Sequence, residues 1–195
     1  MAVSSISVEE QKEMTGKTAM PLLWIGITSI IMLFAGLTSA YVVRKGNGTW
    51  LLFDLPNTFY QSTGIIVLSS ITMFLAQRAI KKDDLSKVMM WLGATLLLGA
   101  GFVFSQVMAW GDLVDAGVFF AGSASNASGS FLYALTGLHI AHLAGGIIAL
   151  LITFFKSSRK KYSSNDHLGI QLCGTYWHFL GLLWIYLLLF LHFIR

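Results

Sequence analysis

The segment 131-FLYALTGLHIAHLAGGIIALLITFF-155 decides the fold class. It contains no Asp, Glu, Lys or Arg, and it is longer than the roughly 20 residues that a helix needs to cross a bilayer. His139 and His142 lie three residues apart in its first half, on one helical face, with Cβ atoms about 5–6 Å apart. Because a histidine that faces lipid is costly, we expect both side chains to point into a protein interior or a wet cavity.

The composition is that of a membrane protein. The chain has 195 residues, of which 55% are hydrophobic and only 11% are charged, against roughly 25% charged residues in a soluble domain. This length suits one compact membrane domain. The net charge of +4 comes from short loops, so we interpret it as a topology signal and expect no nucleic-acid binding. The single cysteine, Cys173, excludes an intramolecular disulfide.

Five apolar segments predict an all-α membrane protein with one five-helix domain, residues 22–195, after a cytoplasmic tail at residues 1–21. The tail lacks a short apolar region followed by a small-residue cleavage site, so we expect no removed signal peptide. Pro21 is expected to open the first helix, since proline suits a helix's first turn. The predicted spans are residues 22–43, 60–80, 88–110, 131–155 and 172–194.

The basic residues predict the orientation of these spans. With five spans, the N-terminal tail shares a side of the membrane with the second and fourth loops. That side carries ten of the 13 basic residues: Lys12, Lys17, Arg78, Lys81, Lys82, Lys87, Lys156, Arg159, Lys160 and Lys161. The positive-inside rule therefore places the N-terminus in the cytoplasm and the C-terminus in the periplasm.

The histidines raise the possibility of a metal or haem site, since imidazole is a common haem ligand. At 1.5 Å per residue, His139 and His142 lie roughly 12–18 Å below the outer surface, whereas His178 lies about 6–9 Å from the inner one. His192 lies close to the outer surface, and no Asp or Glu lies inside a span to complete a site. The favoured interpretation is packed histidines bonded to backbone or hydroxyl groups.

A free-standing channel or transporter is a less favoured alternative. Pumps place charged groups at mid-membrane, but the spans hold none there, and Arg78 can snorkel to the surface from its helix end. Glycines within the spans permit close helix packing, either internally or against another membrane subunit. Trp184 and Tyr186 lie deeper than interfacial aromatic residues, which predicts a buried protein interface or a lipid-lined cleft.

Motifs in all five spans resemble one family. The fourth span contains TGLHIAH (136–142) with Gly146 beyond, and the fifth contains YWHF (176–179) followed by Trp184. The earlier spans contribute Thr28-Ser29, Phe34-Ala35-Gly36, Ala40-Tyr41, Asn57-Thr58, Leu98-Gly99, Phe102, Gln106 and Trp110. In this order they are similar to cytochrome c oxidase subunit III, in its short five-helix bacterial form.

The resemblance implies a subunit without redox centres in a bacterial haem–copper terminal oxidase, which reduces oxygen and pumps protons. It implies a multi-pass protein of the inner membrane, packed against catalytic subunit I and the other oxidase subunits, with membrane phospholipid bound in a cleft. A respiratory supercomplex is a further expected partner. Haem and copper are expected in the partner subunits and none in this chain. The alternatives are the equivalent subunit of a quinol oxidase and a nitric oxide reductase-associated homologue.

Three positions depart from the family pattern, because Ile30, Ala109 and Gly181 stand where many members carry an acidic residue. A proton-transfer role for those acids therefore does not carry over, and a structural, lipid-binding role is favoured. The residues that the resemblance implies as lipid-cleft or packing residues are His139, His142, Tyr176, Trp177 and His178. No catalytic, cofactor-binding or metal-binding residue is predicted.

Overall fold

The computed structural model describes residues 8–46, 50, 54–122, 125–164 and 166–194 of the chain. It contains the helices α1 (Val8–Lys45), α2 (Asn57–Ile80), α3 (Leu85–Asp115), α4 (Ala127–Ser158) and α5 (Leu168–Ile194). All five are long and apolar enough to cross a membrane, which confirms the prediction of an all-helical protein with five spans.

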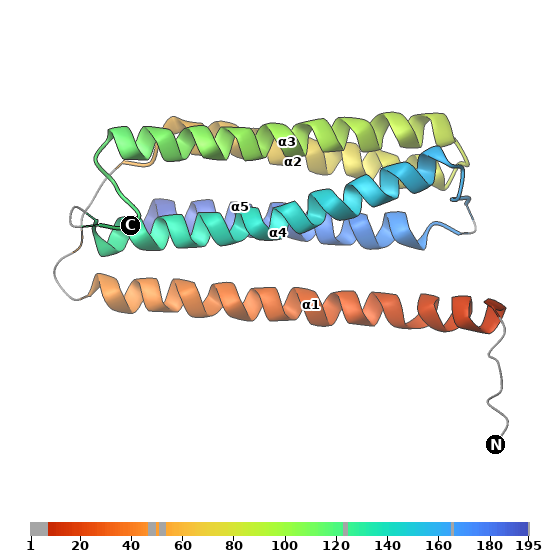
Figure 1. Ribbon diagram of the computed structural model, residues 1–195, viewed down its shortest axis with the longest axis horizontal. Helices are drawn as coiled ribbons and strands as arrows, with labels where there is room; N and C mark the ends of the chain where they lie inside the picture. Colours follow the sequence, from red (N-terminus) through yellow and green to blue (C-terminus); the bar gives the residue numbers. More distant parts are fainter. Residues whose placement is uncertain (1–7, 47–49, 51–53, 123–124, 165, 195) are drawn as a thin grey trace, which may run out of the picture.

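The helices form three layers along a common direction (Figure 1). Helices α2 and α3 lie side by side, α4 and α5 form a second pair, and α1 lies along the outside of that pair. The first turns of α1, the α2–α3 connection and the α4–α5 connection meet at one end of the bundle. Ten basic residues of the sequence lie in these segments or in the helix turns next to them. Which end faces the cytoplasm stays a prediction.

The start of α1 differs from the prediction. We expected Pro21 to open the first helix after a tail, but α1 begins at Val8 and Pro21 lies inside it. The preceding residues 9–14 read EEQKEM, all strong helix formers, so the helix extends beyond the apolar segment. Residues Gly16–Lys45 of α1 form a segment that is long and apolar enough to span a membrane.

Polar caps extend α3 and α4 beyond their apolar spans. The Asp84 side chain accepts the backbone N–H of Lys87 at the start of α3, and the Asn126 side chain accepts that of Ser128 at the start of α4. Helices α3 and α4 consequently begin three and four residues before the predicted spans at 88 and 131, and α5 begins four residues before the one at 172. Hydropathy locates the part that crosses lipid, and the caps determine where the helix begins.

Hydrogen bonds between side chains join neighbouring helices at several depths. The indole N–H of Trp110 donates to Thr136, and Gln106 donates to Ser62. Thr72 and Thr95 share a further bond between α2 and α3. Thr136 also donates to its own helix, at the carbonyl of Leu132. Hydroxyl groups therefore satisfy their own helix and a neighbouring helix together, as expected for polar residues in spans.

The two connections at one end of the bundle are also joined. Asp83, in the α2–α3 turn, has φ of 54° and accepts the backbone N–H of Ser164 from the α4–α5 connection. Hydrogen bonds from the side chain and the backbone of Ser164 hold the pKa of Asp83 below its usual value. This contact links the two helix pairs outside the membrane-spanning segments.

Candidate functional site

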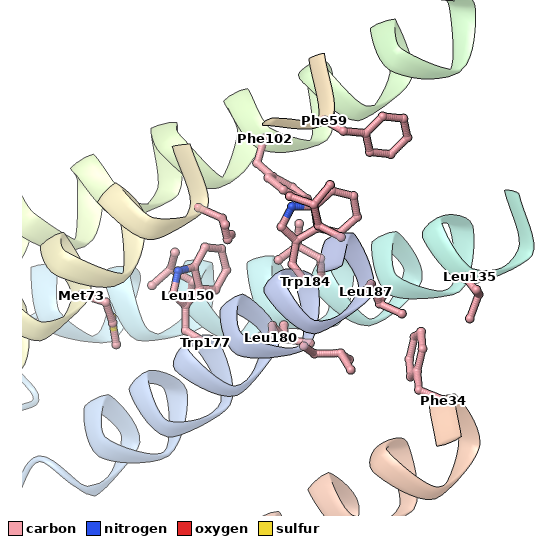
Figure 2. Packing of buried hydrophobic residues seen from close by; sticks show 14 of the residues in the cluster. Phe34, Phe59, Met73, Phe102, Leu135, Leu150, Trp177, Leu180, Trp184 and Leu187 are labelled. Atoms are coloured by element: carbon pink, nitrogen blue, oxygen red, sulfur yellow. The ribbon is translucent and has the colours of Figure 1, made fainter. Parts of the chain in front are cut away.

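Trp177 of α5 lies at the centre of the bundle (Figure 2) and is 1% exposed. Its indole N–H donates to the hydroxyl of Ser69 on α2 at 3.1 Å. The ring lies over Gly99 of α3, where an added Cβ would be 2.6 Å from the Trp177 Cη2 atom. On the other side the ring lies 3.5 Å from the position of a Cβ at Gly146 of α4. This side chain of α5 therefore contacts three other helices, and two glycines make the room for it.

Trp184, two turns further along α5, occupies a second aromatic cluster. Its ring stacks on Phe59 at 5.9 Å and meets the edge of Phe102 at 5.0 Å, and its N–H donates to Thr63. The side chain is fully buried. Our prediction that Trp184 faces an interface or a lipid-lined cleft is therefore wrong, because α2 and α3 cover it.

Tyr186, the other deep aromatic residue of α5, lies on a different face. It is 46% exposed, and its hydroxyl group shares a hydrogen bond of 3.1 Å with Thr38 of α1. Lys45 reinforces this contact between α1 and α5 by donating to the carbonyl of Ile194 at 2.7 Å. Tyr186 therefore helps to hold α1 against α5.

His139 lies against the Trp184 cluster. Its ring is 5.2 Å from the ring of Trp184 and 6.0 Å from that of Phe102, and the side chain is fully buried. Neither ring nitrogen has a hydrogen-bond partner among the described residues. We expected the packed histidines to bond to backbone or hydroxyl groups, and for His139 this is wrong because aromatic side chains surround it.

His142 has different surroundings, although it lies only one turn away. Its Nδ1 donates to the carbonyl of Leu138 at 2.8 Å, and its ring is 5.8 Å from that of Phe34 on α1. Tyr176 of α5 donates its hydroxyl to the carbonyl of His142 at 3.2 Å. Bonding to the backbone is confirmed for this histidine. The two histidines thus contact different neighbouring helices rather than one shared site.

His178 and His192 belong to two further surfaces. His178 is half-buried and lines a cavity between α2 and α5, and His192 bonds to Tyr60 through its Nδ1 at 2.8 Å. Over the part of the chain that the structure describes, no three His, Cys, Asp or Glu side chains lie close enough to hold a metal ion. The four histidines of the last two spans therefore lie in four different environments.

A cleft at the end of α4 was missed by the sequence reasoning. It has a volume of about 500 Å³ and is lined by Ile152, Phe155, Lys156, Arg159 and Lys161. We interpreted the basic residues of this segment only as the signal that ends the fourth span, because their number is enough to support that interpretation. The spacing of Ile152 and Phe155 ahead of Lys156 and Arg159 was the available sign, since residues three and four apart share a helical face.

The comparison with known proteins decides the family. Residues 53–194 match the family model described as cytochrome c oxidase subunit III. This chain belongs to that family. The subunit 3 of the Corynebacterium diphtheriae cytochrome c oxidase is 30% identical over 85% of this chain and 82% of its own length.

Two further relatives of the subunit III family cover most of the chain. The probable cytochrome c oxidase subunit 3 of Nocardia farcinica is 32% identical over 88% of this chain and 85% of its own length. The cytochrome c oxidase subunit 3 of Bacillus sp. strain PS3 is 27% identical over 92% of this chain and 87% of its own length. These matches confirm the resemblance that the motifs indicated.

The positions that depart from the subunit III pattern lie in packed surroundings. Ala109 is fully buried in α3, and Ile30 of α1 packs against the hydrophobic core. A Cβ added at Gly181 would be 3.2 Å from the hydroxyl oxygen of Ser70. Apolar or small side chains at these three positions let the helices pack without a buried carboxylate, which would require a partner.

We predict that replacing His139 by leucine keeps or raises stability. An unpaired buried polar group costs about 1–3 kcal/mol, so an apolar side chain of similar size is expected to increase the free energy of unfolding by about 1 kcal/mol. Denaturant unfolding in detergent, followed by tryptophan fluorescence, measures the change. His142→Leu is the matched control and should destabilise, because it removes the bond to Leu138. A large loss of stability in His139→Leu alone would contradict this account.

Proposed function

We propose that this chain is the non-redox accessory subunit III of a bacterial haem–copper terminal oxidase, which reduces oxygen to water and pumps protons. It stabilises the catalytic subunit in the inner membrane and holds phospholipid at its surface. The relatives, each named as a cytochrome c oxidase subunit 3, support this assignment and favour cytochrome c over quinol as electron donor.

The divergence of the histidines is the observation that carries the non-redox role. His139 lies among aromatic rings, His142 bonds to its own helix, and His178 lines a cavity on another face. A metal held by several imidazoles, or a haem held between two of them, requires side chains that converge on one point. The polar groups of the spans instead connect helices, as the bond from Trp177 to Ser69 does. This use of polar groups fits a subunit that acts through packing.

The cleft at the end of α4 supports phospholipid binding. Lys156, Arg159 and Lys161 line it at the end of the span, beside the exposed apolar side chains of Ile152 and Phe155. Cationic side chains next to apolar ones match an anionic headgroup and the first part of its acyl chains. The three bases also lie near the C-terminus of α4, where the helix dipole favours positive charge.

The half-exposed members of the predicted site add to this lipid-facing surface. His142, Tyr176 and His178 are intermediate in exposure, whereas His139 and Trp177 are buried. The buried pair can act only through packing of the bundle. We therefore propose lipid contact for His142 and Tyr176 and a packing role for His139 and Trp177, whereas His178 lies in a separate groove between α2 and α5.

Replacing Lys156 and Arg159 together by glutamine is expected to weaken the binding of anionic phospholipid by about thirtyfold, at roughly 1 kcal/mol per charge, and so to reduce the amount that co-purifies with the complex. Mass spectrometry of extracted lipid measures the phospholipid content. A separate activity assay gives the number of turnovers before the oxidase loses activity. Lys82→Gln, a basic residue of the α2–α3 turn outside the cleft, is the control. Unchanged lipid content and an unchanged operating lifetime would refute the lipid-binding part of the proposal.

A further inference from the structure

A groove between α2 and α5 opens toward the surface of the bundle at the level of His178. It holds a cavity of about 280 Å³, lined by Ile66, Val67 and Ser70 of α2 and by His178, Gly181, Leu182 and Ile185 of α5. The α2 and α5 helices run in opposite directions, so Ser70 faces Gly181 across the groove. The groove lies away from the cleft at the end of α4.

His178 and Ser70 place polar atoms inside the membrane. His178 lies ten residues from the start of α5 and Ser70 ten residues from the end of α2, about 15 Å from the same end of the bundle. The hydrocarbon layer is about 30 Å thick and both helices extend beyond it, so both side chains lie within the hydrocarbon, nearer to this end of the bundle. A polar side chain at this depth requires a hydrogen-bond partner.

Neither side chain has such a partner within the described part of the chain. The other hydroxyl groups along this helix behave differently, since Ser62, Ser69 and Thr72 each donate to a carbonyl of α2. His178 is half-buried and makes no hydrogen bond to a described residue, in contrast to His142 and His192. The Ser70 hydroxyl and the His178 imidazole can therefore form hydrogen bonds with whatever covers the groove.

The shape of the groove suits a helix rather than a flat surface. Gly181 and Ser70 form a floor of small residues, and small residues let helix backbones approach closely. The rim carries Val67 and Leu182, which are 41% and 68% exposed. A side chain from another helix can enter between them and reach the polar atoms on the floor.

We propose that the α2–α5 groove receives a transmembrane helix of another oxidase subunit, which presents a hydrogen-bonding side chain to His178 and Ser70 within the membrane. A lipid acyl chain fills the same volume but offers no hydrogen bond, so it leaves both polar groups unpaired. The inference rests on the proposed function, because it requires the chain to be part of a complex. It names the face of the subunit that the complex covers.

Photocrosslinking in the intact complex tests this surface. A benzoylphenylalanine is placed at Leu182, and the matched control is Leu97 of α3, which is 76% exposed and lies at a similar depth. After illumination of membranes, the complex is purified and the adducts are identified by mass spectrometry. We expect at least fivefold more adduct to another oxidase subunit from position 182 than from position 97. Adducts to lipid alone at position 182 would overturn the inference.

A second measurement uses substitutions that leave the fold of the chain intact. Leu182→Trp fills the groove from an exposed position, and His178→Phe removes the imidazole. Each is expected to lower the amount of haem-containing partner that co-purifies by about tenfold, equal to about 1.4 kcal/mol, while Leu97→Trp leaves it unchanged. Full association of both groove variants would overturn the inference. If the unaltered chain retains no haem-containing partner, the proposed function itself fails, so the two failures are distinct.

Discussion

Replacing Trp177 by alanine is expected to lower the free energy of unfolding by about 3 kcal/mol. Lipid is as apolar as the bundle core, so the loss comes from the cavity and from missing van der Waals contacts rather than from transfer to water. The indole contacts Gly99 and Gly146 and donates to Ser69, so its removal loosens α2, α3 and α4 around α5 together. Denaturant unfolding in detergent, followed by circular dichroism, measures the effect.

Two variants separate this packing role from a general effect of losing a tryptophan. Trp24→Ala removes a tryptophan of α1 that is 56% exposed, and we expect little change in stability. Trp177→Phe keeps most of the ring volume but loses the bond to Ser69, so its effect should lie between the two. Equal stability of Trp177→Ala and the unaltered protein would contradict the central position of this side chain.

Adding a single methyl group at Gly99 is expected to destabilise the protein by about 1–3 kcal/mol, because overpacking a filled core forces side chains out of their rotamers. The new Cβ would lie 2.6 Å from Cη2 and 2.9 Å from Cζ2 of Trp177. The indole is held by its bond to Ser69 and by Gly146 behind it, so it has little room to move. Gly99→Ala is the variant, and the same unfolding measurement applies.

Gly101→Ala is the matched control for this substitution. Gly101 lies two residues after Gly99 on α3, and a Cβ added there would meet no atom within 4 Å. Alanine is also the better helix former, so Gly101→Ala should be neutral or stabilising. Combining Gly99→Ala with Trp177→Phe should recover part of the loss, since phenylalanine is smaller than tryptophan. An additive double variant, with no recovery, would show that the two residues do not compete for the same space.

Hydropathy was sufficient to predict the number of spans, since an uncharged apolar segment as long as 131–155 is typical of a transmembrane helix. It could not predict helix ends, which Asp84 and Asn126 determine through local hydrogen bonds. Hydropathy also failed to predict that Pro21 lies inside α1, because this helix begins well before its apolar part. Local chemistry outside the apolar runs therefore accounts for the differences.

The candidate site shows a similar division. Spacing correctly placed His139 and His142 on the same part of α4, but it could not show that they contact different helices. Trp184 looked unusually deep in its span, and only the positions of Phe59 and Phe102 reveal that it is covered. The neighbours of a transmembrane side chain depend on the rotation of each helix, which a single hydropathy pattern does not define.

The haem content of the separated chain tests the central claim most directly. The tagged chain is purified from membranes in mild detergent, its visible spectrum is recorded, and the complex is then dissociated in a stronger detergent. We predict haem absorbance in the intact complex, and after dissociation a colourless chain with the haem retained by its partner. A haem spectrum in the isolated chain, or a chain that migrates alone without a haem-containing partner, would contradict the assignment as a non-redox oxidase subunit.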